Sequence, residues 1–149
     1  ASATVTPSST PTQWKASLYF PDQAYMYLVR EEKVISNGSA LDVSGRAKLL
    51  LNELIAGDNT VIPAGVRVLS TSFSNGILTV DLSGEFDRNL NGGSTAVNMV
   101  LGQIVLTLTE LDEVKSVQFK IEGNVVDEFK GLVTLNKPFT RDDYRQLIR

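Results

Sequence analysis

Three carboxylates near the middle of the chain could carry hydrolytic chemistry. Asp81 and Glu85 lie four positions apart at the end of an alternating apolar run, and Asp87 follows two positions later. A glycoside hydrolase needs two carboxyl groups held about 5–10 Å apart across a sugar-binding cleft. Acidic residues at strand ends more often cap loops and helix starts. We therefore rank a carboxylate-based hydrolase below the binding functions described below.

Asp87 also begins a segment with part of the pattern of a calcium-binding loop. The run Asp-Arg-Asn-Leu-Asn-Gly, residues 87–92, has oxygen-bearing side chains at alternate positions and a glycine at the sixth. The twelfth position is Asn98, which cannot supply the bidentate carboxylate of such loops. The pattern is more typical of an Asn/Gly turn leading into a helix, so we expect no metal.

The residues after this turn open a predicted helix and could face an anion. Gly92, Gly93, Ser94 and Thr95 would expose backbone N–H groups at its start. No lysine follows at the spacing of a nucleotide-binding P-loop, so no cofactor is expected. We interpret Ser94 or Thr95 as a helix cap. Ser94 and the carboxylates of residues 81, 85 and 87 form the predicted ligand loop.

Four aromatic residues lie near the start of the chain: Trp14, Tyr19, Tyr25 and Tyr27. Such side chains can stack on sugar rings or anchor a protein partner, and they also pack at the edges of cores and hairpins. If Tyr25 and Tyr27 share one exposed strand face, they form the best candidate contact patch. We therefore predict a partner contact at these two tyrosines.

Composition narrows the range of possible functions further. The 149 residues are 42% hydrophobic and 21% charged, which is ordinary for a globular domain. A net charge of −3 argues against binding to a nucleic-acid backbone, which requires a basic surface. The absence of His and Cys excludes Cys/His nucleophile–base pairs and zinc sites with the usual ligands. No apolar run reaches the roughly 18 residues of a membrane-spanning helix, and no signal peptide is visible.

Alternating and helical periodicities predict the elements of the first half. Residues 15–20 and 25–35 are predicted to be two strands that continue into each other as a hairpin. A helix follows, with Asp42 as its N-cap and Gly57 in the left-handed conformation that ends many helices. Residues 66–72 and 77–83 read as strands joined by an Asn-Gly turn at 74–76. The face predicted to point inward carries three apolar residues: Leu78, Val80 and Leu82.

The segment 91–126 is predicted to hold the central helix and its partner strand. Five apolar residues recur at four- and three-residue steps on one helix face: Val97, Leu101, Ile104, Leu108 and Leu111. Residues 115–121 then alternate, and residues 125–126 read as a short returning strand after a tight turn. In the tail, Thr140 and Asp143 suit a capping box, and Phe139 and Tyr144 suit a hydrophobic staple.

This order of elements predicts an α+β domain. Two main helices would pack on one face of a mainly antiparallel or mixed sheet. Residues 1–14 are rich in Ser, Thr and Pro and are predicted to be a disordered linker. Residues 15–149 would form the single folded domain.

The chain resembles the GerMN domain family over residues 15–144. The most specific pieces are VDLSGEF at residues 80–86 and GQIVLTLTELDEVKSVQFKIEG at residues 102–123, which occur in the family's order and spacing. The resemblance implies a fold like the ring-building motifs of a sporulation channel. It also implies a bacterial extracytoplasmic lipoprotein, as in GerM-like and LpqB-like proteins, and links the chain to sporulation or germination. The family has no established catalytic residues to transfer.

The leading expectation is therefore a non-enzymatic assembly or protein-interaction module of the cell envelope. Its partner would be an envelope protein or another copy of the chain, in contact with a sheet edge and a helix. The Ser/Thr/Pro-rich start fits a stalk leading from a lipid anchor that is absent from this chain, and the only membrane contact would be through that anchor. The alternative is a module that binds the glycan of peptidoglycan.

Overall fold

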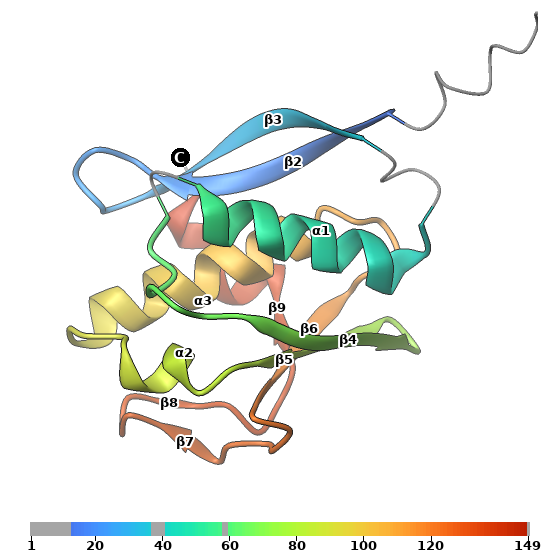
Figure 1. The fold of residues 1–149 in the computed structure, drawn as a ribbon. Helices are drawn as coiled ribbons and strands as arrows, with labels where there is room; N and C mark the ends of the chain where they lie inside the picture. Colours follow the sequence, from blue (N-terminus) through green and yellow to red (C-terminus); the bar gives the residue numbers. More distant parts are fainter. Residues whose placement is uncertain (1–12, 37–40, 58–59, 149) are drawn as a thin grey trace, which may run out of the picture.

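The computed structural model describes residues 13–36, 41–57 and 60–148. Figure 1 shows the hairpin of β2 (Gln13–Pro21) and β3 (Leu28–Ser36) on one side of the helices and a larger sheet on the other. Residues 1–12 of the predicted linker lie outside the described residues. The first strand begins at Gln13, two residues before the predicted domain boundary.

The hairpin β2–β3 is an antiparallel sheet of its own, and its pairing runs from Gln13↔Ser36 to Pro21↔Leu28. The two strands predicted in this region are both present. The second begins at Leu28 rather than Tyr25, because Asp22 caps the intervening loop with its own side chain and ends the ladder.

Helix α1 (Val43–Ala56) begins as predicted, since Asp42 Oδ1 accepts a hydrogen bond of 2.8 Å from Gly45 N. Its end differs from the prediction. Gly57 is extended, with φ −68° and ψ 141°, and is not left-handed. A Cβ atom there would lie 2.5 Å from Phe20 Cε1. The glycine is therefore required by the close approach of β2 and not by a left-handed turn.

The four-stranded sheet has the order β4-β5-β6-β9. β4 (Val68–Ser74) and β5 (Ile77–Leu82) form the predicted hairpin, with positive φ at Asn75 and Gly76. β6 (Ser116–Ile121) runs parallel to β5 after a helical crossover, and β9 (Phe139–Thr140) pairs antiparallel with β6. The predicted inner face is correct, because Leu78, Val80 and Leu82 are each at most 1% exposed.

Helix α3 (Ser94–Leu108) is the crossover and lies at the centre of the core. Residue 97 and every residue from 99 to 108 are buried, because β2 and α1 pack beside it and the four-stranded sheet lies beyond it. A helix buried on all sides can carry apolar residues around its whole circumference. Its buried Thr107 is satisfied, since Thr107 Oγ1 accepts from Tyr19 N at 3.0 Å.

The remaining elements are short. α2 (Glu85–Arg88) precedes α3, and the pair β7 (Glu128–Phe129) and β8 (Val133–Thr134) follows β6. Phe86 stacks on Phe129 with ring centroids 5.4 Å apart, which fixes α2 against β7. Residues 125–126 belong to no strand, because the turn after β6 closes earlier, through a bridge between Ile121 and Asn124.

The predicted tail arrangement is present in the 3₁₀ helix η3 (Arg141–Leu147). Thr140 N donates 2.8 Å to Asp143 Oδ2, and the capping box is complete. Phe139 and Tyr144 are in contact, with ring centroids 5.9 Å apart, as a hydrophobic staple requires. The α+β class is therefore confirmed, with a separate hairpin on the far side of the helices. No helix in the described ranges has the length and apolarity needed to cross a membrane.

Candidate functional site

The connection between β2 and β3, residues Asp22–Tyr27, is here called the aromatic loop. Its ends are joined, because Asp22 N donates 2.9 Å to the Tyr27 carbonyl. Asp22 Oδ1 also accepts from Met26 N at 3.0 Å and from Tyr27 N at 3.3 Å. One aspartate thus binds several backbone groups of the loop and holds it in a defined conformation.

The aromatic loop presents three consecutive large side chains to solvent. Tyr25 is 51% exposed, Met26 is 62% exposed and Tyr27 is 39% exposed. The two tyrosines do not lie on a strand face as predicted, because the ladder ends at Pro21. Tyr25 instead adopts a φ of 56°, a left-handed conformation that costs free energy for a bulky residue. Both tyrosines are nevertheless accessible to a partner.

A groove of about 440 Å³ lies beside Tyr25 at the start of α3. The buried residues Leu90, Met99 and Val100 contribute apolar surface to it. None of its lining side chains is charged; the full lining is Tyr25, Val61, Leu90, Asn91, Gly93, Thr95, Ala96, Met99 and Val100. This surface is called the apolar groove below.

The apolar groove unites two predicted features that lie far apart in the sequence. Tyr25, from the predicted contact patch, borders the same space as Asn91, Gly93 and Thr95, from the turn before α3 and its first residues. Tyr27 and Ser94 do not line it. The N-cap of α3 is Gly93, which has no side-chain capping bond, so the predicted capping by Ser94 or Thr95 is wrong. Thr95 borders the groove instead.

The three predicted carboxylates point to other partners. Asp81 Oδ1 accepts 2.9 Å from Gly123 N, which stabilises the turn after β6. Asp87 forms an ion pair of 3.2 Å with Lys130, next to β7. Neither carboxylate borders the apolar groove. Both therefore hold neighbouring segments in place.

Glu85 pairs with Arg88 at 3.3 Å within α2. A hydrogen bond from the Ser83 hydroxyl is the largest cause that holds the pKa of Glu85 below its usual value. A general acid of a glycosidase needs the opposite, a raised pKa. In the described ranges, no three acidic side chains gather where they could hold a metal ion. The geometry therefore gives no support to hydrolysis or to a calcium loop.

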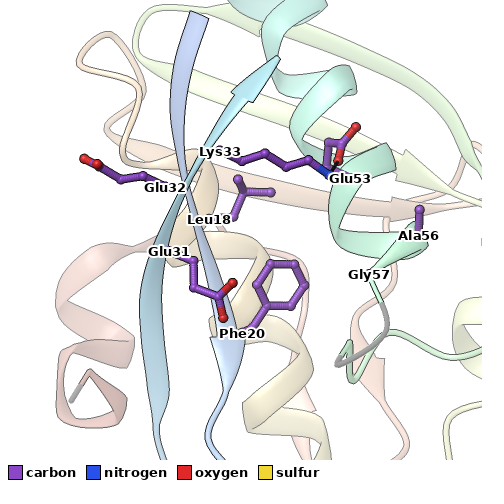
Figure 2. Close-up of a pocket in the computed structure, with 8 residues that line it drawn as sticks. All are labelled: Leu18, Phe20, Glu31, Glu32, Lys33, Glu53, Ala56 and Gly57. Carbon is purple, nitrogen blue, oxygen red and sulfur yellow. Dashed lines mark hydrogen bonds and ion pairs between the residues drawn. The ribbon is translucent and has the colours of Figure 1, made fainter.

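A second groove, of about 330 Å³, was not predicted from the sequence. Figure 2 shows it between β3 and the end of α1, with Phe20 beside Glu31 and with Lys33 paired to Glu53. Lys33 is 58% exposed and Glu32 is 46% exposed. Ion pairs between such exposed groups contribute little free energy. Three glutamates and one lysine line the groove, so its surface is solvated and acidic.

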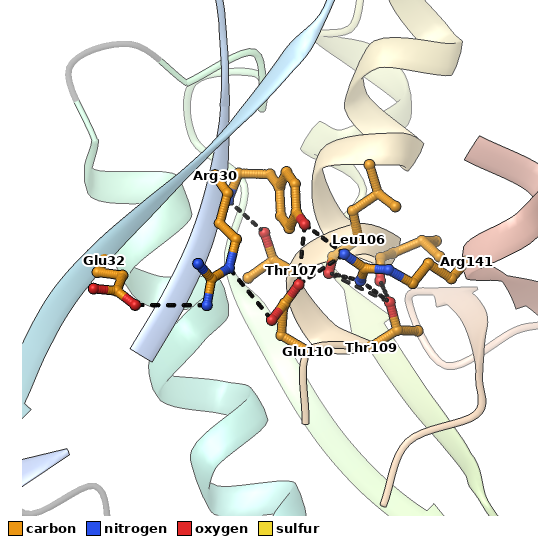
Figure 3. Close-up of polar contacts among 9 residues, drawn as sticks. Arg30, Glu32, Leu106, Thr107, Thr109, Glu110 and Arg141 are labelled. Atoms are coloured by element: carbon orange, nitrogen blue, oxygen red, sulfur yellow. Dashed lines mark hydrogen bonds and ion pairs between the residues drawn. The ribbon is translucent and has the colours of Figure 1, made fainter. Parts of the chain in front are cut away.

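A polar network connects the first hairpin to the central helix (Figure 3). Tyr19 Oη donates 3.0 Å to Glu110 Oε2, and Arg141 Nη2 lies 2.7 Å from the same oxygen. Arg141 also donates 2.9 Å to the Leu106 carbonyl and 3.0 Å to Thr109 Oγ1. Burial first, and then the hydrogen bond to Glu110, raise the pKa of Tyr19. The network fixes β2 on α3 and thereby positions the aromatic loop.

Comparison with solved structures supports this architecture. A candidate lipoprotein from Clostridium perfringens matches with a TM-score of 0.61 and 22% identity, over 93% of this chain and 95% of that chain. The first GerMN domain of the Bacillus subtilis sporulation protein GerM matches with a TM-score of 0.69 and 20% identity, over 87% and 99%. At these identities the likeness establishes the fold alone.

The tandem GerMN domains of Bacillus subtilis GerM match with a TM-score of 0.68 and 26% identity. This alignment covers 89% of the present chain and 47% of the tandem chain, so the chain spans about half of that relative. Comparison with the curated proteins finds no match. The profile of the Germane family, described as sporulation and spore germination, matches residues 17–127, which is well over half of the sequence. The chain therefore belongs to the Germane family and has the GerMN fold.

Proposed function

We propose that the chain is a non-enzymatic, extracytoplasmic interaction domain of a bacterial cell-envelope lipoprotein. Its partner is another envelope protein, and the contact lies at the aromatic loop and the apolar groove. The family description and the likeness to a candidate lipoprotein support the cellular setting, including a link to sporulation or germination. The single observation that supports this location is that Tyr25 is exposed at the rim of an uncharged groove.

The chemistry of the surface indicates what the partner presents. Exposed apolar side chains that cluster on a soluble domain mark interaction sites, and Tyr and Met are enriched at protein interfaces. The uncharged lining of the groove favours an apolar side chain over an ion, because a buried charge there would lack a counter-charge. The partner therefore inserts an apolar side chain beneath Tyr25, while Met26 and Tyr27 cover its flank.

The hydrogen bonds of Asp22 add to the affinity of such a contact. A loop that is already ordered loses less conformational entropy on binding than a flexible one. The left-handed backbone at Tyr25 also supports a binding role, since strain at a bulky exposed residue often accompanies function.

A second candidate function is recognition of the peptidoglycan glycan. It is favoured by the position of the polar residues Asn91 and Thr95 beside the Tyr25 ring, since sugars are bound by stacking on aromatics together with hydrogen bonds. The polar share of the lining is small, which is why a protein partner is preferred. The following experiment separates the two functions.

The purified chain is mixed with an envelope fraction of the source bacterium and sedimented. Three aliquots of the fraction are compared: untreated, protease-treated and muramidase-treated. We expect binding to be lost after protease and retained after muramidase. Binding that survives protease and disappears after muramidase would establish glycan recognition in place of the proposed function.

The double variant Tyr25→Ala, Tyr27→Ala tests the location of the contact in the same assay. We expect it to lose most of the sedimented fraction. The matched control is Val125→Ala, Leu132→Ala, which removes two other exposed apolar side chains outside the groove. Equal losses in both double variants would show that the aromatic loop is not the contact.

A further inference from the structure

Strand β4 is the long free edge of the four-stranded sheet. It lies at one end of the order β4-β5-β6-β9, whereas the strand at the other end, β9, has two residues. β4 has seven residues and pairs only with β5 among the described strands. An edge strand of this length presents a row of backbone groups to which another strand can add.

The register identifies which backbone groups face outward. Ser74 and Ile77 flank the two-residue turn, and in such a hairpin the flanking pair is hydrogen-bonded. Hydrogen-bonded and non-bonded pairs alternate along an antiparallel ladder, so Ser72 binds β5 while Thr71 and Phe73 direct N–H and C=O away from it. No other described strand takes up these outward groups.

The edge lacks the usual protection against pairing. Natural edge strands are protected by charged side chains, proline or bulges. β3 follows this rule, with four successive charged residues at 30–33. β4 reads Val-Leu-Ser-Thr-Ser-Phe-Ser and has neither charge nor proline. Its one device is the bulge between Val68 and Ser70, which leaves the regular stretch Ser70–Ser74 open.

We propose that β4 pairs antiparallel with β4 of a second copy of this chain, about a two-fold axis at Ser72. Thr71 and Phe73′ then exchange N–H···O=C bonds on each side of the axis, where the prime marks the second copy. Ser72 faces Ser72′, and Ser70 faces Ser74′. The three serines are small, exposed and neutral, and the partly buried Thr71 and Phe73 carry no charge either, so the edge can pair with itself without charge repulsion. The two sheets become one sheet of twice the width.

A second copy suits this edge better than a charged or bulky segment. On the solvent side of the sheet, every side chain of Ser70–Ser74 is a serine. A symmetric pairing therefore places a hydroxyl opposite a hydroxyl on that side. The bulge stops the pairing at the same place in both copies. The assembly is a closed pair because each copy uses its β4 edge in the two-fold contact. The pairing is independent of the aromatic loop and of the partner proposed above.

Ser72→Lys and Ser72→Glu test the pairing, because residue 72 is exposed and either change leaves the core intact. The dissociation constant of the dimer is measured by sedimentation equilibrium for the wild-type chain, for each variant and for their equimolar mixture. We expect a reversible wild-type dimer and a dissociation constant about fivefold higher or more in each variant, since like charges meet at the axis. The mixture is expected to restore a dimer through a Lys–Glu pair.

Thr134→Lys is the matched control, because it adds the same charge to an exposed strand residue of β8. It should dimerise like the wild type, as should Tyr25→Ala, which keeps this test separate from the envelope-binding assay. A wild-type chain that stays monomeric through the concentration series would overturn the proposal. A dimer that Ser72→Lys leaves unchanged, or that the mixture does not restore, would overturn it as well.

Discussion

The two long hairpins of this domain differ in how they are held and in what they expose. β4–β5 is closed by two residues, Asn75 with φ 54° and Gly76 with φ 80°, which is the geometry of a type I′ turn. β2–β3 is closed by the longer loop Asp22–Tyr27, which is ordered by a side chain. The backbone conformation of two residues closes β4–β5, whereas the loop of β2–β3 depends on the side chain of Asp22.

Their contacts with the rest of the molecule differ in the same way. The inner face of β5 is fully buried against the core, whereas β3 carries exposed charges and is connected to α3 through β2. The network of Tyr19, Glu110 and Arg141 provides part of that connection. β5 thus gives the core a continuous buried face, while β2–β3 packs on α3 and presents the aromatic loop at its end.

The largest difference is expected between a buried position of β5 and an exposed position of β3. Leu78→Ala on β5 removes a side chain with 0% exposure and should lower the free energy of unfolding by about 2–5 kcal/mol. Val34→Ala on β3, where Val34 is 56% exposed, should change it by less than about 0.5 kcal/mol. Chemical denaturation measures both. Similar losses would show that β3 is as deeply integrated as β5.

The next effect concerns the attachment of the first hairpin. Arg141→Ala removes hydrogen bonds to Leu106, Thr109 and Glu110, and should cost about 1–3 kcal/mol in urea denaturation. Arg145→Ala is the control, because Arg145 is 70% exposed and its pair with Asp142 lies at the surface. If the two arginine variants were equally stable, the network would not be what holds β2 in place.

The stability of the chain should depend on the backbone conformation of Gly76, in the turn between β4 and β5. Gly76→Ala places a Cβ at a φ of 80° and within 3.3 Å of Lys115 Cγ, at an expected cost of about 1 kcal/mol. Gly76→Asn should cost less, because asparagine tolerates the left-handed conformation. Melting temperatures in the order wild type, Asn, Ala would agree with this account, whereas an equal drop for Asn and Ala would point to the contact with Lys115.

Alkaline pH should lower the free energy of unfolding of the chain. Burial raises the pKa of Tyr19 and of Tyr144 in the folded chain above the ordinary value of 10.0. Their contribution to stability is complete below pH 10.0 and is lost as pH rises toward the folded pKa values. At about pH 10.5 the loss should be at most about 1 kcal/mol per tyrosine. Tyr144→Phe should flatten the decline, and an unchanged slope would contradict this assignment.

The smallest stability change is expected at Tyr25 itself. Tyr25→Gly relieves the strain of a φ of 56° but adds flexibility to the unfolded chain, for a net gain of about 0.5 kcal/mol. Binding to the envelope fraction should nevertheless fall. A loss of stability together with retained binding would mean that Tyr25 is a structural residue of the loop.

Sequence patterns predicted much of the second hairpin and of the tail. Three of these features depend on neighbours within a few positions: the Asn75-Gly76 turn, the buried face of Leu78, Val80 and Leu82, and the capping box of Thr140. Local hydrogen bonds and side-chain periodicity decide such features, and both can be read from the chain. The N-cap at Asp42 belongs to the same class.

The errors occurred where a distant contact overrides a local preference. Gly57 suggested a left-handed helix end, but it is there because Phe20 approaches it closely. Tyr25 and Tyr27 are an exception, because the capping by Asp22 that places them in a loop and not on a strand face is a local contact. The paired carboxylates suggested a site, but Asp81 and Asp87 hold Gly123 and Lys130 instead.

The sequence by itself determined the α+β class, the central helix and the family to which the chain belongs, because these depend on periodicity and order along the chain. Only the tertiary structure brought Tyr25 beside Asn91 and Thr95, and only it left β4 as a free edge. Both follow from how α3 packs between the hairpin and the sheet. Packing of that kind depends on side chains that are distant in sequence, which no local pattern records.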